Sequence, residues 1–93
     1  MAISFSDRVS IPDDVLISNL QEESVILNLQ SERYFGLDSI GTRILTLLST
    51  SESIEKAYEK LLQEYDVDGQ VLREDLSVLV EDLAAKGLIR VHT

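Results

Sequence analysis

The chain has 93 residues, the length of one small domain. Eight Lys and Arg residues against seventeen Asp and Glu residues give a net charge of −9, which disfavours nucleic acid and anionic membrane surfaces as partners. The absence of cysteine excludes disulfides, thiolate metal sites and cysteine nucleophiles, and no apolar run is long enough to span a membrane. We therefore expect a globular cytoplasmic protein that binds neither nucleic acid nor membrane.

The N-terminal region divides into an arm and the start of a domain. Residues 1–14 are polar and irregular and contain the only proline, so they are expected to form an extended arm. The domain is expected to span residues 15–93. Its first predicted element is a strand over 15–20, where the sequence is VLISNL.

Two further strands are predicted after the first one. Residues 24–30 alternate in their second half, with Leu27 and Leu29 on one face and polar side chains on the other, which favours a half-buried strand. A tight turn without glycine follows at 31–33, and a short third strand occupies 34–37. The short polar connections predict an antiparallel meander.

The hydrophobic period then changes to that of helices. Asp38 is suited to cap a first helix, which ends before the serine-rich segment 49–53. A second helix is predicted over 54–65. A third begins after the cap Asp68, and Gly87 stands at its C-terminal stop position.

Three strands followed by three helices predict the α+β class, with the helices on one face of a small sheet. Residues 88–93 are too short for more than a tail or a small edge strand.

The sequence contains few candidates for catalytic or metal-binding residues. His92 is the only histidine, and near the chain end a solvated side chain is the simpler interpretation. Residues 64–75 partly match a calcium loop with Gly69 at the turn, but Asp75 replaces the bidentate Glu and Leu72 stands at a ligand position. A turn followed by a helix cap explains the same residues. We therefore expect no catalytic residue, metal or cofactor, and a binding protein in place of an enzyme.

The third predicted helix has a core seam and an unusual flank. The leucines of the seam fall on one line at about 100° per residue: Leu72, Leu76, Leu79 and Leu83. On the flank, Val71 and Val78 alternate with Asp75 and Asp82. Two interpretations stay open, a wide core face, or a groove walled by the valines with the aspartates as polar anchors.

The third predicted strand carries two adjacent aromatic residues, Tyr34 and Phe35, and is apolar on both faces. As the last strand of a meander, it has one unpaired edge unless the helices cover it. Such an edge can accept an added peptide strand, with the two rings on its two faces. The alternative is that both rings pack inside the domain.

Two stretches follow a family pattern: VILNLQSERYFGLDSIGTRILTLL, and later LLQEYDVDGQVLREDLSVLVEDLAAKGLI. The order is an apolar strand, a turn, an aromatic pair, a Gly-Leu-Asn-like step, a glycine-containing helix, a Tyr-Asp-Val turn and a last helix ending in Gly-Leu-Ile. It resembles the PqqD-like domains, or RiPP recognition elements, and most of all the standalone members of lasso-peptide biosynthesis. The resemblance covers about residues 15–90. It departs at Asp38, where Asn is frequent, and at 31–32, where Gly is frequent.

The resemblance implies a winged-helix-like fold that binds the leader segment of a ribosomally made precursor peptide. The leader would add as a strand to the third strand, lie beside the third helix, and be presented to a modifying enzyme, in lasso systems a leader peptidase. The peptide-binding residues carried over are Arg33, Tyr34, Phe35, Gly36, Leu37, Val71, Asp75, Val78 and Leu79, to which the flank pattern adds Asp82.

Other functions are weighed against this one. The first is a PqqD-type peptide chaperone for a radical or cyclising enzyme. A winged-helix DNA-binding protein is disfavoured by the charge of −9. We expect a monomer or a weak homodimer, in which two copies pair their third strands until the leader displaces one.

Overall fold

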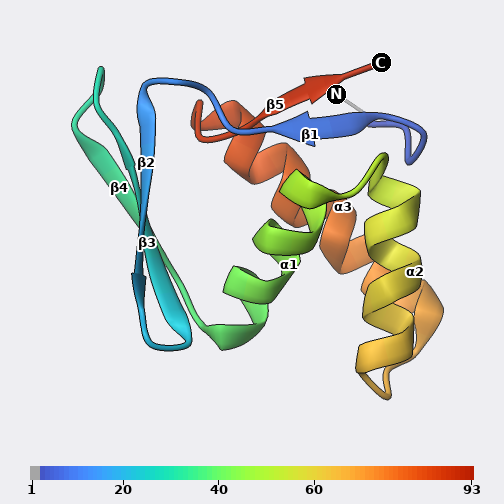
Figure 1. The fold of residues 1–93 in the computed structure, drawn as a ribbon. Coiled ribbons are helices and arrows are strands. Elements are labelled where there is room, and N and C mark those ends of the chain that lie inside the picture. The colour runs from blue at the N-terminus through green and yellow to red at the C-terminus, as the bar shows by residue number, and fades with distance from the viewer. Residues whose placement is uncertain (1–2) are drawn as a thin grey trace.

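The computed structural model describes residues 3–93 and contains two small sheets and three helices (Figure 1). In chain order the elements are β1 (Arg8–Ser10), β2 (Val15–Leu20), β3 (Glu23–Asn28), β4 (Arg33–Leu37), α1 (Ser39–Thr50), α2 (Ile54–Glu64), α3 (Gly69–Ala85) and β5 (Arg90–His92). Strands β2, β3 and β4 form an antiparallel sheet in chain order, and β1 pairs antiparallel with β5. The predicted α+β class, with a three-stranded sheet followed by three helices, is confirmed. None of the helices between residues 3 and 93 has the length and hydropathy that crossing a membrane requires.

Strand β1 lies inside the segment that was expected to be an arm. Val9, in its centre, is 2% exposed and pairs with Val91 of β5. Just before the strand, the carbonyl of Asp7 accepts a hydrogen bond from the Ile54 N–H at 2.8 Å. This bond satisfies one of the backbone donors left free at the start of α2. The chain ends therefore meet on the helical part of the molecule, and the three-stranded sheet stands to one side (Figure 1).

Strand β3 buries the side that looks polar in the sequence. Ser24, Ile26 and Asn28 are buried, whereas Leu29, beyond the strand, is 50% exposed. The prediction that Leu27 and Leu29 form the apolar face of this strand was wrong, because β3 ends at Asn28 and Leu27 lies on the face opposite the buried one. Both buried polar side chains are hydrogen-bonded, as burial requires.

Asn28 ends β3 and holds the turn that follows. Its side-chain oxygen accepts hydrogen bonds from the N–H groups of Gln30 at 2.9 Å and Ser31 at 3.2 Å. Its side-chain nitrogen donates to the carbonyl of Gly87 at 3.2 Å. The strand predicted over 24–30 therefore ends at Asn28. Beyond it, the N–H groups of Gln30 and Ser31 bond to the Asn28 side chain in place of a neighbouring strand.

The helices begin at the residues that the sequence marks, whereas α1 ends later than predicted, because it continues through residues 49–50 of the serine-rich segment. Asp38, Ser53 and Asp68 are the N-caps, and each accepts a hydrogen bond from an N–H group of the first turn. Gly87 follows α3 with φ +72°, a left-handed conformation that glycine adopts without steric cost.

Carboxylates at two of the ligand positions in the calcium-like segment 64–75 have other partners. Asp68 caps α3, and Glu64 forms an ion pair with Arg43 at 2.6 Å. The hydrogen bond from Arg43 lowers the pKa of Glu64 below its usual value. In the part of the chain that the structure describes, no three His, Asp or Glu side chains are grouped closely enough to hold a metal ion.

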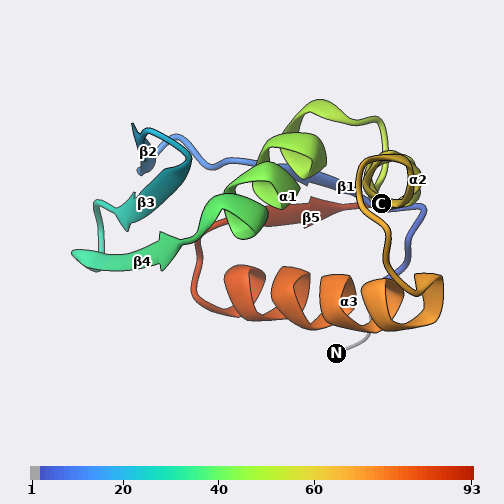
Figure 2. The same ribbon diagram turned by 90° about the horizontal axis from the view of Figure 1, so that it is seen from below.

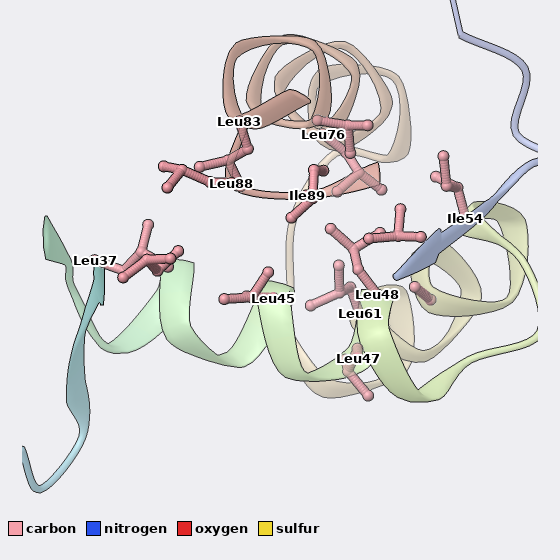
Figure 3. Close-up of a cluster of buried hydrophobic side chains, with 14 of the residues drawn as sticks. Leu37, Leu45, Leu47, Leu48, Ile54, Leu61, Leu76, Leu83, Leu88 and Ile89 are labelled. Atoms are coloured by element: carbon pink, nitrogen blue, oxygen red, sulfur yellow. The ribbon is translucent and has the colours of Figure 1, made fainter. Parts of the chain in front are cut away.

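The core lies between α1, α2, α3 and the short segment that enters β5 (Figure 3). On α3, the buried residues are Leu76, Val80 and Leu83, whereas Leu72 and Leu79 are only half-buried. The predicted leucine seam was wrong: the buried side of α3 is rotated about the helix axis towards Val80. Because of this rotation, Leu79 is turned partly towards the flank of the helix.

Replacement of Gly87 by alanine tests the junction between α3 and the sheet. The backbone at Gly87 is left-handed, a conformation that costs a residue with a Cβ about 1 kcal/mol or more. The added Cβ would also lie 3.2 Å from the Asn28 side-chain nitrogen. We expect Gly87→Ala to lower the free energy of unfolding by about 1–3 kcal/mol in urea denaturation.

The matched control is Gly36→Ala. No atom lies within 4 Å of a Cβ built on Gly36, so its free energy of unfolding should change by no more than about 0.5 kcal/mol. Equal losses in the two variants would contradict the role given to Gly87.

Candidate functional site

Strand β4 is an edge of the three-stranded sheet. It pairs with β3 through a register that places Tyr34 opposite Leu27, Phe35 opposite Ile26 and Gly36 opposite Val25. Within residues 3–93, no other strand pairs with its outer side. Figure 2 shows β4 at the rim of the sheet, with β3 between it and β2. The strand therefore presents unpaired backbone N–H and C=O groups to an extended chain.

The two aromatic side chains of β4 lie on opposite faces of the sheet. Phe35 shares the face of Ile26, which is buried against the helices, and is itself half-buried. Tyr34 shares the opposite face with Leu27 and is 76% exposed. Leu37, two residues after Phe35 and on the same face of the strand, belongs to the core. A chain added to β4 would meet an aromatic ring on each side.

The end of α3 meets β4 at Phe35. Lys86, the C-cap of α3, places its amino group 4.7 Å from the centre of the Phe35 ring. The same amino group lies 2.9 Å from the Asp82 carboxylate. A cation over an aromatic face is attracted by the ring, and an exposed contact contributes about 0.5–1 kcal/mol. This contact shows which side of the end of α3 faces the strand.

The side of α3 that carries Lys86 includes three of the residues predicted to bind the peptide. Asp75, Leu79, Asp82 and Lys86 are spaced by four, three and four residues, so they lie along one side of the helix. Leu79 is half-buried, and the two aspartates are exposed. The structure therefore brings β4 and these three predicted residues to the same side of the molecule.

The two valines of the predicted flank lie further round the helix. Val71 is 52% exposed and Val78 is 66% exposed. Val71 also stands about 22 Å from Lys86 along the helix axis, at 1.5 Å per residue. It is therefore the predicted residue most remote from β4.

A hollow of about 390 Å³ lies where the β3–β4 turn meets the end of α3. Its lining residues are Glu32, Arg33, Tyr34, Phe35, Lys86 and Leu88. Phe35 is half-buried and supplies apolar surface, Leu88 is only 2% exposed, and Arg33 and Lys86 supply cations. Sequence reasoning missed Lys86 and Leu88, although the spacing of Lys86 from Asp75 and Asp82 places it on the same flank.

The charges along this region are of both signs, and two of them, on Lys86 and Asp82, lie 2.9 Å apart. Arg33 and Lys86 provide cations where the turn meets the helix end, and Glu32 is the one acid in the hollow. Further along α3, Asp82 and Asp75 provide carboxylates. Such an arrangement can orient a bound chain by its own charges, and it contains no nucleophile paired with a base.

Comparisons with known proteins agree with this geometry. The family model described as coenzyme PQQ synthesis protein D (PqqD) matches residues 23–89, which include β4 and all of α3. A solved structure, "TbiB1 in Complex with the TbiA(beta) Leader Peptide", is similar with a TM-score of 0.81 and 36% sequence identity, over 87% of this chain and 94% of that chain. A search of curated proteins found no match. The chain therefore belongs to the PqqD family.

Proposed function

We propose that the protein binds the leader segment of a ribosomally synthesised precursor peptide, and that the leader pairs as an added strand with β4. The observation that carries the proposal is the unpaired edge of β4 beside the end of α3. The similarity to TbiB1, which was solved with a leader peptide, supports the class of ligand. Strand addition is a recurrent way for a protein to hold an extended peptide.

Backbone pairing alone is too weak for this function. A micromolar complex requires about 8 kcal/mol, whereas each main-chain hydrogen bond contributes about 1 kcal/mol net. The five residues of β4 therefore cannot supply the whole affinity. The hollow walled by Phe35 and Leu88 offers the apolar surface in which a leader side chain can be buried as an anchor.

The carboxylates of α3 supply polar recognition in the proposal. Asp82 is already paired with Lys86. Asp75 forms no ion pair with any residue between 3 and 93. It is therefore the acid that can accept a Lys, an Arg or a backbone N–H of the leader without breaking an existing contact.

The proposed role is that of a non-catalytic accessory protein. The bound leader would bring the rest of the precursor to a maturation enzyme, which in lasso-peptide systems is a leader peptidase. The family description, a coenzyme synthesis protein, favours a second candidate: the same peptide-binding edge serving a radical or cyclising enzyme. The precursor encoded beside the gene distinguishes the two pathways.

Val78→Asp tests the contribution of the α3 flank. Val78 is 66% exposed, so the variant should keep the fold, while a new carboxylate would lose its hydration beneath apolar leader side chains and so weaken binding. We expect calorimetry with the leader of the precursor encoded beside the gene to show at least about tenfold weaker binding, or 1.4 kcal/mol.

Val67→Asp is the matched control for Val78→Asp. Val67 is 47% exposed and lies in the turn before α3. Its variant should bind the leader as the wild type does. Unchanged affinity in Val78→Asp, or the same loss in Val67→Asp, would remove the flank from the site.

Strand addition is tested by changing the leader and leaving the protein unaltered. N-methylation removes a backbone hydrogen-bond donor and keeps the side chain. Donors that face a neighbouring strand occur at alternate residues, so methylation at every second position of the paired segment should abolish binding. Methylation at the intervening positions should have little effect in the same calorimetric assay. A uniform response along the leader would contradict pairing with β4.

A further inference from the structure

The three-stranded sheet has a second open edge, on β2. All six residues of this strand pair with β3 in an uninterrupted register from Val15 opposite Asn28 to Leu20 opposite Glu23. Its other side has no strand partner in the part of the chain that the structure describes. In Figure 2, β2 and β4 lie at opposite edges with β3 between them. A chain paired with β2 would therefore not compete for the edge of β4.

The β2 edge lacks the features that normally prevent strand addition. The sequence VLISNL contains no charged residue and no proline, and its register contains no bulge. Leu16, Ile17 and Leu20 are 51%, 37% and 63% exposed. An uncharged, partly apolar edge is unusual on a chain with a charge of −9.

Acidic side chains stand at both ends of this edge. Asp13 and Asp14 precede β2, and Glu22 and Glu23 follow it. None of the four forms an ion pair with any residue between 3 and 93. Arg90 lines the hollow beside Asp13 and Asp14.

At the end of the edge near Glu22 and Glu23, the basic residue Arg43 lines a hollow with Glu22, but its guanidinium group is already paired with Glu64. A hollow of about 840 Å³ at this end is lined by Asn19, Leu20, Gln21, Glu22, Glu23 and Ser39. The stronger attraction for a cation is therefore at this end of β2.

These charges disfavour a second copy of the chain as the occupant in the register that pairs the exposed leucines of β2. Antiparallel pairing of two β2 strands about Ser18 would match Leu16 of one copy with Leu20 of the other. It would also place Glu22 of each copy opposite Asp14 of the other copy, and like charges that face each other across strands destabilise the pairing. A chain with basic ends has no such conflict.

We propose that the β2 edge docks an extended segment of a partner protein, uncharged and apolar at alternate positions in its centre, with Lys or Arg at both ends. The two basic ends would be about 27 Å apart, the extended length between Asp14 and Glu22. Backbone pairing along β2, contact with Leu16 and Leu20, and the terminal carboxylates would act together. This site is independent of the leader, so the sheet can hold both chains at once.

The test is an NMR titration of the full isotope-labelled chain with a synthetic peptide of about ten residues, in which alternating Val and Thr stand between two pairs of lysines. The largest amide shifts are expected at residues 15–20. The double variant Glu22→Lys/Glu23→Lys should bind at least about fivefold more weakly, because two attractions become repulsions. The control Glu52→Lys/Asp66→Lys changes the net charge equally at exposed positions away from the sheet, and its affinity should fall by less than about twofold.

Four outcomes would overturn the proposal. The shifts could centre on residues 33–37, which would place the peptide on β4. Equal losses in the two double variants would reduce the interaction to net charge. A peptide flanked by glutamates could bind as tightly as the lysine peptide. Concentration-dependent shifts of 15–20 without any peptide would identify a second copy as the occupant.

Discussion

The geometry of the candidate site depends on one buried amide, the side chain of Asn28. Its oxygen holds the N–H groups of the β3–β4 turn, and its nitrogen donates to the carbonyl of Gly87, just after α3. One side chain therefore sets the distance between the start of β4 and the end of α3. That distance places Lys86 over Phe35 and leaves a hollow between the strand and the helix. A buried polar group is costly when unpaired, so these three bonds hold the junction in one arrangement.

Within residues 3–93, each outer strand of the three-stranded sheet lacks a strand partner on one side, a condition that can lead to aggregation. The charge of the chain offers a physical reason why the edges can stay open. Acidic residues occupy the approach to β2 and both turns of the sheet, in a molecule whose net charge is −9. Copies of the chain repel one another, whereas a peptide that is neutral or basic does not meet this barrier. The negative charge that keeps other copies away from the edges thus favours neutral or basic peptides as the chains that pair with them.

Local signals predicted most of the fold. The caps Asp38 and Asp68 and the stop at Gly87 are decided within a few residues, so these three helix bounds followed from the sequence. The β1–β5 pair could not be predicted, because its strands are short and lie at opposite ends of the chain. The burial of Asn28 depends on a carbonyl 59 residues away. In the site, the open strand was expected from its aromatic pair and from the family resemblance, whereas Lys86 and Leu88 were missed because only tertiary structure brings the end of α3 to β4.

Amide hydrogen exchange with and without the leader tests the central claim most directly. In the free protein, the N–H groups of β4 that point away from β3 are unpaired and should exchange rapidly. Saturation with the leader should protect alternate amides within Arg33–Leu37 and leave Val15–Leu20 unchanged. Protection confined to β2, or none in β4 at saturation, would contradict the account.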